Sequence, residues 1–343
     1  MKKYTMQLML VVSLVFLLVA CGNDDGASEG NEIETGKKYE LRLGTVISEP
    51  HPWADMAEYF AEEVEKQTNG NVKVSIHANG SLGNDETIIE ELRMGTVDFI
   101  IGGAQNAAAF VPQYQIFGIS YLFEDMDHFE KAISNDSPLY DYLKTEYENR
   151  SLDMKLLSLA GGGTRYLSNN KGEIKTPEDL DGIKMRIPSS PIESEVWSAL
   201  GALPTSLAWN ELYSAVQTGV VNSFESTLSG YTGSKLYEVA PYVSLTEHLY
   251  MASHFSMSEA TYNKLPAEYN EIIEKVAIEA GKLGTKRGIE MDKELLEELP
   301  SLKVTTTEVD KQAFIDILTP LHDKLAKDSE ATDLLEIVRE LKD

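Results

Sequence analysis

The feature that most constrains the fold is an alternation of strand and helix patterns near the start of the chain. β-Type runs cover 39–47, 72–77 and 97–101, and amphipathic helical stripes cover 53–67 and 85–94 between them. Strands that are joined through crossover helices pair in parallel, and the helices cover the sheet. The order therefore predicts an α/β fold in which a ligand binds beyond the carboxyl ends of the strands.

Three loops follow the carboxyl ends of these strands, at 48–53, 78–86 and 103–113. Their imidazole, carboxylate and amide groups can exchange hydrogen bonds with a hydroxyl-bearing ligand. The alternatives are that His51 belongs to a helix-entry turn and that Glu86 caps a helix. The candidate ligand-binding residues in these loops are His51, Glu86, Gln105 and Asn106.

Two arginines stand out in a chain with 56 acidic and 30 basic residues. Arg165 and Arg186 each lie in a β-type run, and a guanidinium presents a planar fork of donors that matches a carboxylate. We expect both to hold the carboxylate of a small acidic solute. The alternatives are a surface ion pair of Arg186 with an acid at 178–181, and an Arg165 that orients Arg186 or pairs with Glu225.

The segment after these arginines supplies further candidates. A helix is expected to begin at Trp209, which could also be a core residue, and a strand at 220–224 is expected to aim the residues after it into a cleft. The candidates here are Trp209, Asn210, Glu225 and Ser226. The run at 161–163 is three glycines, which predicts a flexible crossover between strands at 154–159 and 164–168.

A long helical pattern lies between Pro266 and Pro300. Its 33 inner residues would extend about 50 Å at about 1.5 Å per residue, which is longer than a small domain. The pattern therefore predicts either one helix along both domains or a helix with a kink at its glycines. Strands are expected at 239–245 and 249–257, and a helix from Lys311 to the end.

The N-terminus has the pattern of an exported lipoprotein. Two lysines precede an apolar run at 8–20, which is short for a membrane span and typical of a signal peptide. Small residues then precede Cys21, the only cysteine, in a pattern that resembles a lipobox. The acidic segment at 22–36 is expected to be a disordered linker. We expect localisation outside the cytoplasm, with lipidated Cys21 as the membrane anchor.

Several function classes are unsupported by the sequence. The formal net charge of −26 argues against nucleic acid as a partner. The 6 histidines are scattered, no H-E-x-x-H or G-x-S-x-G motif occurs, and the glycine run lacks the spacing of a nucleotide-binding loop. We therefore expect no enzyme activity, no cofactor, no metal and a monomeric chain.

From about residue 39 onward the chain resembles a known family, the DctP-type extracytoplasmic solute-binding proteins of TRAP (tripartite ATP-independent periplasmic) transporters. The resemblance rests on four segments that occur in the family's order. They are HANGSLGNDETIIEELRMGTVDF, GGGTRYLSNNKGEIKTPEDLDGIKMRIP, ELYSAVQTGVVNSFES and LYEVAPYVSLTEH.

The resemblance implies roles for individual residues. In the family, an arginine at the place of Arg186 makes a bidentate salt bridge to the ligand carboxylate, and one at the place of Arg165 often assists. Ser226 stands where the family commonly has a ligand-contacting asparagine, Asn222 where it has an aspartate and Ser223 where it has a glycine. These departures weaken any assignment of the solute by analogy.

The resemblance implies a two-domain periplasmic-binding-protein fold that closes over an organic acid and delivers it to a TRAP permease. A sugar acid such as a uronate is favoured and a C4-dicarboxylate comes next. A ligand-presenting sensor for a membrane histidine kinase and, less favoured, a surface hydrolase are the alternatives. The expected parts are a signal peptide at 1–20, a lipidated linker at 21–38, domain I at 39–162 plus 250–290, and domain II at 163–249 plus 291–343.

Overall fold

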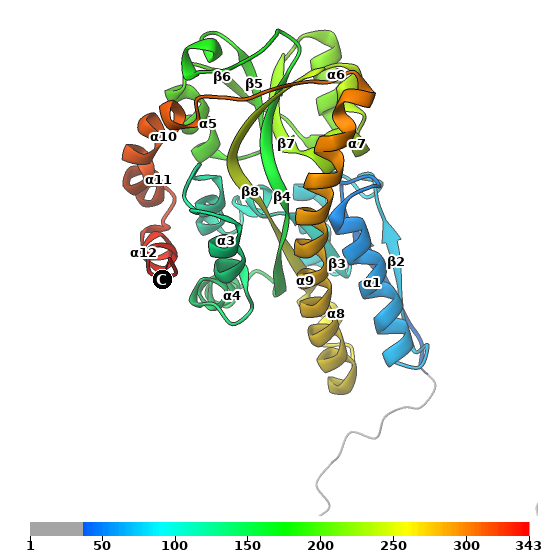
Figure 1. Cartoon of the computed structure of the whole chain (residues 1–343). Coiled ribbons are helices and arrows are strands. Elements are labelled where there is room, and N and C mark those ends of the chain that lie inside the picture. The colour runs from blue at the N-terminus through cyan, green and yellow to red at the C-terminus, as the bar shows by residue number, and fades with distance from the viewer. Residues whose placement is uncertain (1–36, 343) are drawn as a thin grey trace, which may run out of the picture. The chain divides into compact units, whose positions relative to one another are not determined.

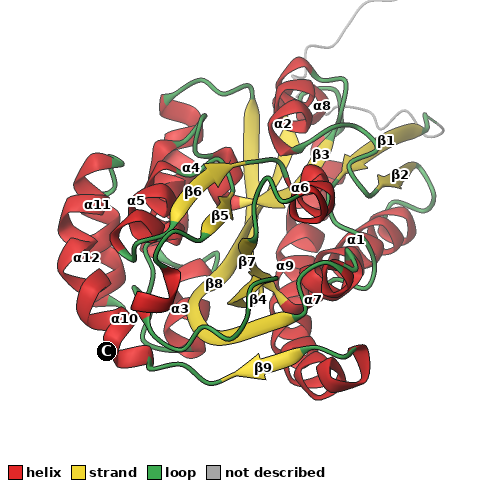
Figure 2. Cartoon of the chain, turned by 90° about the horizontal axis from the view of Figure 1, so that it is seen from above, coloured by secondary structure: helices red, strands yellow, loops and turns green. Residues whose placement is uncertain are grey.

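The computed structural model describes residues 37–342, so the expected signal peptide, Cys21 and most of the linker lie outside the described residues. Figures 1 and 2 show an α/β protein in which helices pack around a twisted sheet. The strands are β1 (Tyr39–Gly44), β2 (Val72–His77), β3 (Phe99–Gly103), β4 (Met154–Asn169), β5 (Lys184–Ile187), β6 (Leu203–Ser206), β7 (Ser223–Thr227), β8 (Tyr242–Ser258) and β9 (Thr305–Thr307).

The helices alternate with these strands through most of the chain. The α-helices are α1 (Pro52–Gln67), α2 (Asp85–Met94), α3 (Met126–Ile133), α4 (Pro138–Asn149), α5 (Pro191–Ala199), α6 (Leu212–Thr218), α7 (Leu228–Gly233), α8 (Glu259–Tyr262), α9 (Ala267–Glu298), α10 (Lys311–Leu318), α11 (His322–Asp328) and α12 (Thr332–Glu340). Short 3-10 turns are η1 (Ala104–Ala107), η2 (Pro112–Gly118), η3 (Pro177–Leu180), η4 (Trp209–Glu211), η5 (Leu236–Glu238), η6 (Leu299–Leu302) and η7 (Thr319–Leu321).

The sheet consists of two parallel sets of strands joined by a long antiparallel pair. Its order is β2-β1-β3-β8-β4-β7-β5-β6, and β9 pairs with β8. The first set, β2-β1-β3, is parallel as predicted, and so is the second set, β7-β5-β6. Strands β8 and β4 run antiparallel to each other and to the set on either side. The expected α/β class is confirmed.

The long strands correct two expectations from the sequence. The segments 154–159 and 164–168 belong to one strand, β4, and the expected strands at 239–245 and 249–257 form one strand, β8, which begins at Tyr242. The glycine run is not a separate crossover, because β4 stays paired with β8 on both sides of it. Its pairing register shifts between Gly161 and Thr164, and Gly163 takes a left-handed φ of 105°. The glycines therefore make an irregularity within a strand.

Helix α9 is one continuous helix of 32 residues, and it extends along the molecule from beside α8 to beside α7 in Figure 1. It crosses β4 very closely. A Cβ atom on Gly288 would lie 2.6 Å from the backbone N of Gly163. Glycine at 288 therefore serves close packing, and no kink occurs there. The long helix predicted from the sequence is confirmed.

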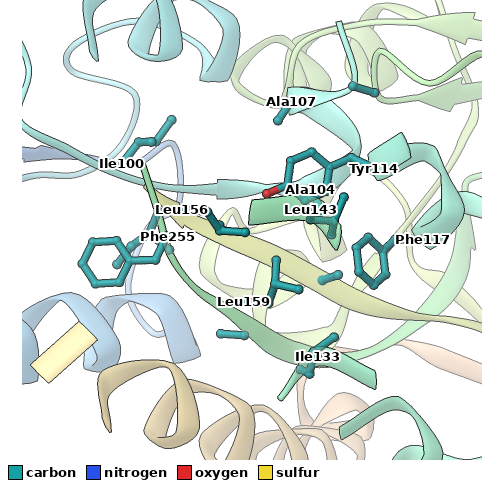
Figure 3. Packing of buried hydrophobic residues seen from close by; sticks show 14 of the residues in the cluster. Ile100, Ala104, Ala107, Tyr114, Phe117, Ile133, Leu143, Leu156, Leu159 and Phe255 are labelled. Atoms are coloured by element: carbon teal, nitrogen blue, oxygen red, sulfur yellow. The ribbon is translucent and has the colours of Figure 1, made fainter. Parts of the chain in front are cut away.

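The core lies between the sheet and the helices around it. Figure 3 shows part of it, where Phe255, Leu156 and Leu159 from the central strands meet Tyr114, Phe117 and Ile133 from flanking segments. A smaller cluster surrounds β7 and includes residues of α6, α7 and the end of α9. No helix among residues 37–342 is both long enough and apolar enough to cross a membrane.

Candidate ligand-binding site

One cavity lies where the carboxyl ends of the two parallel sets of strands face each other. The empty space between its lining atoms is about 520 Å³ when its opening to solvent is included. Elements from both sets line it, together with β4, α7 and β8. The predicted site residues that line it are His51, Gln105, Asn106, Arg165, Arg186, Trp209 and Ser226.

Three predicted site residues do not line this cavity. Glu86 is half-buried in the first turn of α2, and Asn210 is exposed in η4. Glu225 lies in the middle of β7 and is fully buried. The cavity therefore gathers most of the predicted residues around the two arginines, and Glu225 lies behind one of them.

Arg165 is held by an internal ion pair. Its Nε and Nη2 both donate to the carboxylate of Glu225, and Nη2 also donates to the Glu225 carbonyl at 3.3 Å. Burial opposes ionisation of Glu225, but attraction to Arg165 and the hydrogen bonds that Arg165 donates outweigh it and lower the pKa of Glu225. The sequence left open whether Arg165 pairs with Glu225 or belongs to the ligand site. In the structure Arg165 pairs with Glu225 and also lines the cavity.

Arg186 has no such partner. Its Nε donates to the carbonyl of Leu207 at 2.9 Å, and its guanidinium lies 5.6 Å from the ring centre of Trp209. The side chain is 2% exposed, yet it forms no ion pair with any of residues 37–342, including the acids at 178–181. Burial, together with repulsion from Arg165, lowers the pKa of Arg186 to about 10, so the guanidinium is charged at neutral pH.

His51 contributes a neutral hydrogen-bond donor. It caps α1, and its Nδ1 accepts from the backbone N of Trp53 at 3.1 Å. Burial, and then repulsion from Arg165, lowers the pKa of His51 to about 3. A neutral ring whose Nδ1 accepts carries its proton on Nε2. His51 can therefore donate one hydrogen bond, and its ring lies edge-on to Trp53.

Acceptors on the β1–β3 side come from α2 and η1. Asp85 is buried at the start of α2, and its Oδ2 accepts from Asn106 at 2.9 Å. Burial raises the pKa of Asp85 to about 6, which leaves the carboxyl mostly ionised at neutral pH. The side-chain Nε2 of Gln105 donates a hydrogen bond to the carbonyl of Phe117 at 3.4 Å. This wall of the cavity is polar and carries a negative charge.

Several buried polar atoms around the cavity lack a hydrogen-bond partner within residues 37–342. They are Trp53 Nε1, Asp85 Oδ1 and Ser226 Oγ, and all three residues line the cavity. Buried polar groups are nearly always satisfied, so each such atom calls for an explanation. A polar ligand in the cavity would bring donors and acceptors to this part of the site.

Sequence reasoning missed some of these residues. Asp85 resembles a helix-capping residue, but the cap of α2 is Asn84, whose side chain accepts from Thr87. Trp53 is buried in the core, where it is 1% exposed, and it also lines the cavity. Thr227 and Met251 line the cavity from β7 and β8. The position of Asp85 within the predicted ligand-side loop at 78–86 is the one signal that could have identified it.

Metal ligands are a separate question. Over the stretch 37–342, no group of three or more His, Cys, Asp or Glu side chains is arranged to hold a metal ion. The charged groups at the cavity are instead two guanidiniums and one carboxylate. That composition suits recognition of an organic anion with hydroxyl groups.

Comparison with known proteins identifies the family. Residues 43–328 match the family model described as DctP, bacterial extracellular solute-binding protein, family 7. A solute-binding protein of Sulfitobacter sp. (strain NAS-14.1) is 33% identical over 304 residues, which cover 87% of this chain and 90% of that protein.

Solved structures agree with this family. A TRAP periplasmic solute-binding protein from Sulfitobacter sp. NAS-14.1 with bound β-D-galacturonate has a TM-score of 0.82 at 27% identity, covering 88% of this chain and 99% of that one. One from Sulfurospirillum deleyianum with bound succinate has a TM-score of 0.83 at 27% identity, covering 89% and 100%. The chain therefore belongs to the DctP family of bacterial extracellular solute-binding proteins, the solute receptors of TRAP transporters.

Proposed function

We propose that this protein captures a small organic acid by its carboxylate at Arg186 and delivers it to a TRAP permease. The observation that carries the proposal is the buried, unpaired guanidinium of Arg186. A buried charge without a partner is strongly unfavourable, and a ligand carboxylate would supply that partner. Arg165, fixed by Glu225, would add a second positive charge beside the same carboxylate.

A sugar acid suits the rest of the cavity better than a dicarboxylate does. The side of the cavity that follows β1 and β3 offers Asp85 as an acceptor and Asn106 and His51 as neutral groups. Hydroxyl groups would donate to Asp85, whereas a second carboxylate would be repelled by it. The relative with galacturonate therefore makes a closer analogy than the relative with succinate.

We also propose that the ligand is enclosed by closure of two domains with the boundaries given by the sequence, 39–162 plus 250–290 and 163–249 plus 291–343. Strands β4 and β8 and helix α9 run through both parts. The loop at 48–50 lies against α7, where a Cβ on Gly233 would be 3.0 Å from the carbonyl O of Ser48. This contact closes one rim of the cavity, and a hinge motion would open it.

The proposal also covers the absence of catalysis and the attachment of the protein to the membrane. Members of the family are transport proteins and not enzymes, and we propose the same for this chain. We further propose that Cys21 carries the lipid that keeps this protein on the outer face of the cell membrane. Both proposals follow from the pattern of the sequence and from the family.

The proposal is tested by ligand binding to the Arg186→Ala variant. A thermal-shift screen of the purified protein with D-galacturonate, D-galactonate and succinate selects the acid, because a ligand in large excess over its Kd stabilises the folded state. Calorimetric titration should then show at least about 30-fold weaker binding for Arg186→Ala, or more than about 2 kcal/mol.

The control for this experiment is Arg42→Ala on β1. Arg42 donates to the carbonyl of Thr96 at the surface and does not line the cavity. Its variant should bind as the unmodified protein does. Equal affinity of Arg186→Ala and the unmodified protein would refute the carboxylate site.

A further inference from the structure

Behind the two arginines lies a carboxyl group that the proposed function does not use. Glu193 is in the first turn of α5, a few residues after Arg186, and it is 0% exposed. Neither oxygen of its side chain accepts a hydrogen bond from any donor in residues 37–342, and the residue does not line the cavity. Ionising such a group in place is costly.

The groups that face Glu193 come from four other elements. Glu225 of β7 is the negative charge that acts on its carboxyl, and Arg165 of β4 and Arg186 of β5 are the cations that act on it. From η2, Gln115 accepts from the backbone N of Ile192, and Gly118 approaches the Glu193 side chain. His248 of β8 lies on the far side of Glu225, with 3.8 Å between its Nε2 and the Glu225 Oε2.

Two fully buried carboxyl groups whose negative charges repel each other are not readily ionised together. Both oxygens of Glu225 accept from Arg165, so Glu225 is the ionised member. Burial, and then repulsion from Glu225, raises the pKa of Glu193 well above its usual range. Burial lowers the pKa of His248, so that ring is neutral and does not supply the charge. Glu193 is therefore the carboxylic acid of the pair.

Of the two buried arginines, only Arg186 has a positive charge that no carboxylate among residues 37–342 neutralises. Arg165 and Glu225 neutralise each other, and Arg186 keeps its positive charge as long as Glu193 is protonated. An ionised Glu193 would place a second negative charge next to Arg186 and compete with the ligand carboxylate. We propose that Glu193 is a proton-holding residue that sets the anion affinity of the site, which binds an organic acid tightly only while Glu193 is protonated.

This inference rests on the proposed capture of an anion at Arg186, and it adds a coupling to protons. Bound anion disfavours ionisation of Glu193, and by reciprocity the proton on Glu193 favours the anion. Binding should therefore take up a proton wherever free Glu193 is partly ionised. Above the pKa of Glu193, the affinity should fall by about tenfold for each pH unit.

The test is calorimetric titration with D-galacturonate between pH 6 and pH 9.5. The ligand carboxylate stays ionised across this range, because such groups titrate near pH 4. Glu193→Gln keeps the size of the side chain and carries no charge, so it imitates the protonated acid. The unmodified protein should lose affinity toward pH 9.5 and take up protons in buffers of different ionisation enthalpy. Both changes should be smaller in Glu193→Gln, in which Arg186, with its pKa of about 10, and Asp85, with its pKa of about 6, still titrate.

The matched control is Glu195→Gln, which lies on the same helix, is exposed and pairs with Lys324. It should behave as the unmodified protein does. Burial raises the pKa of Asp85 to about 6 and the pKa of Asp292 to about 7. Both groups are present in every variant, so they do not affect the difference between variants. Parallel loss of affinity in the unmodified protein and Glu193→Gln would overturn the inference.

A measurement without ligand separates this inference from the proposed function. If none of the variants binds an acid at any pH, the proposed function fails. The proton on Glu193 is still visible in thermal unfolding. A carboxyl with a raised pKa in the folded state loses stability as pH rises from the ordinary glutamate range to the raised pKa. The melting temperature should therefore fall more steeply for the unmodified protein than for Glu193→Gln, and equal slopes would contradict a protonated Glu193.

Discussion

Arg165 and Arg186 have the same side chain and similar burial, but their partners give them different roles. Glu225 satisfies Arg165 within the protein, whereas Arg186 has one backbone carbonyl and a tryptophan ring. A residue whose charge is already paired positions the site, and one whose charge is unpaired is available to a ligand. Both arginines could be identified as site residues from the sequence. Their different roles could not be assigned, because Glu225 is distant from both in the chain and only the fold shows which arginine it pairs with.

Asp85 should make the protein prefer a ligand with one carboxylate over a ligand with two. We expect Asp85→Asn to shift the ratio of succinate to galacturonate affinity toward succinate by about tenfold, or about 1.4 kcal/mol, because it removes a like charge from the cavity wall. Parallel calorimetric titrations of the two acids at pH 7.5 would measure this ratio.

The pH dependence of the same ratio follows from the pKa of Asp85. Its pKa is raised to about 6, so protonation below pH 6 should reduce the discrimination against succinate in the unmodified protein and not in Asp85→Asn. Glu90→Gln, an exposed change on the same helix, is the control. An unchanged ratio in Asp85→Asn would show that Asp85 does not face the ligand.

Elements with strong local signals agree with the sequence. Helix α2 was expected at 85–94 and is found at Asp85–Met94, with Asn84 as its N-cap and Gly95 in a left-handed conformation at its end. Capping residues and periodicity are local properties, so a sequence shows them directly.

Elements that depend on distant partners were harder to predict. Strand β6 was missed, because its four residues include Pro204 and lie at the sheet edge, where pairing with β5 alone defines the strand. The helix expected from Lys311 onward is divided into α10, α11 and α12 by the 3-10 turn at Thr319–Leu321, which contains Pro320. The role of the glycine run in β4 likewise depends on distant partners, which are the neighbouring strand β8 and helix α9.

The crossing of α9 and β4 should tolerate no side chain at Gly288. A Cβ there would lie 2.6 Å from the N of Gly163 and 2.7 Å from the carbonyl carbon of Gly162, both backbone atoms that cannot move independently. We expect Gly288→Ala to lower the free energy of unfolding by about 1–3 kcal/mol. Urea denaturation would measure it.

The matched control for this crossing is Gly284→Ala, one turn earlier in α9. Its Cβ would meet only the flexible side chain of Met56, at 3.2 Å or more. Alanine is also a better helix former than glycine by about 1 kcal/mol, which should offset the contact. A Gly288→Ala variant as stable as Gly284→Ala would show that the crossing is looser than described.

At the scale of the whole molecule, the enclosed site implies movement. Arg186 is 2% exposed, and the loop at 48–50 lies against α7, so we propose that a ligand reaches the guanidinium when the two halves of the sheet separate. The long strands β4 and β8 and helix α9 connect these halves and are the elements that would bend. Capture would then combine charge recognition by one arginine with closure of the fold around the ligand.

The most direct measurement compares an acid with its uncharged ester. D-Galacturonate and its methyl ester share the ring and the hydroxyl groups, and they differ in the negative charge that Arg186 is proposed to hold. Calorimetric titration of the purified protein at pH 7.5 should show at least about 100-fold tighter binding of the acid, since a buried, hydrogen-bonded charge pair is lost with the ester. Equal binding of acid and ester, or binding of the ester alone, would contradict carboxylate capture.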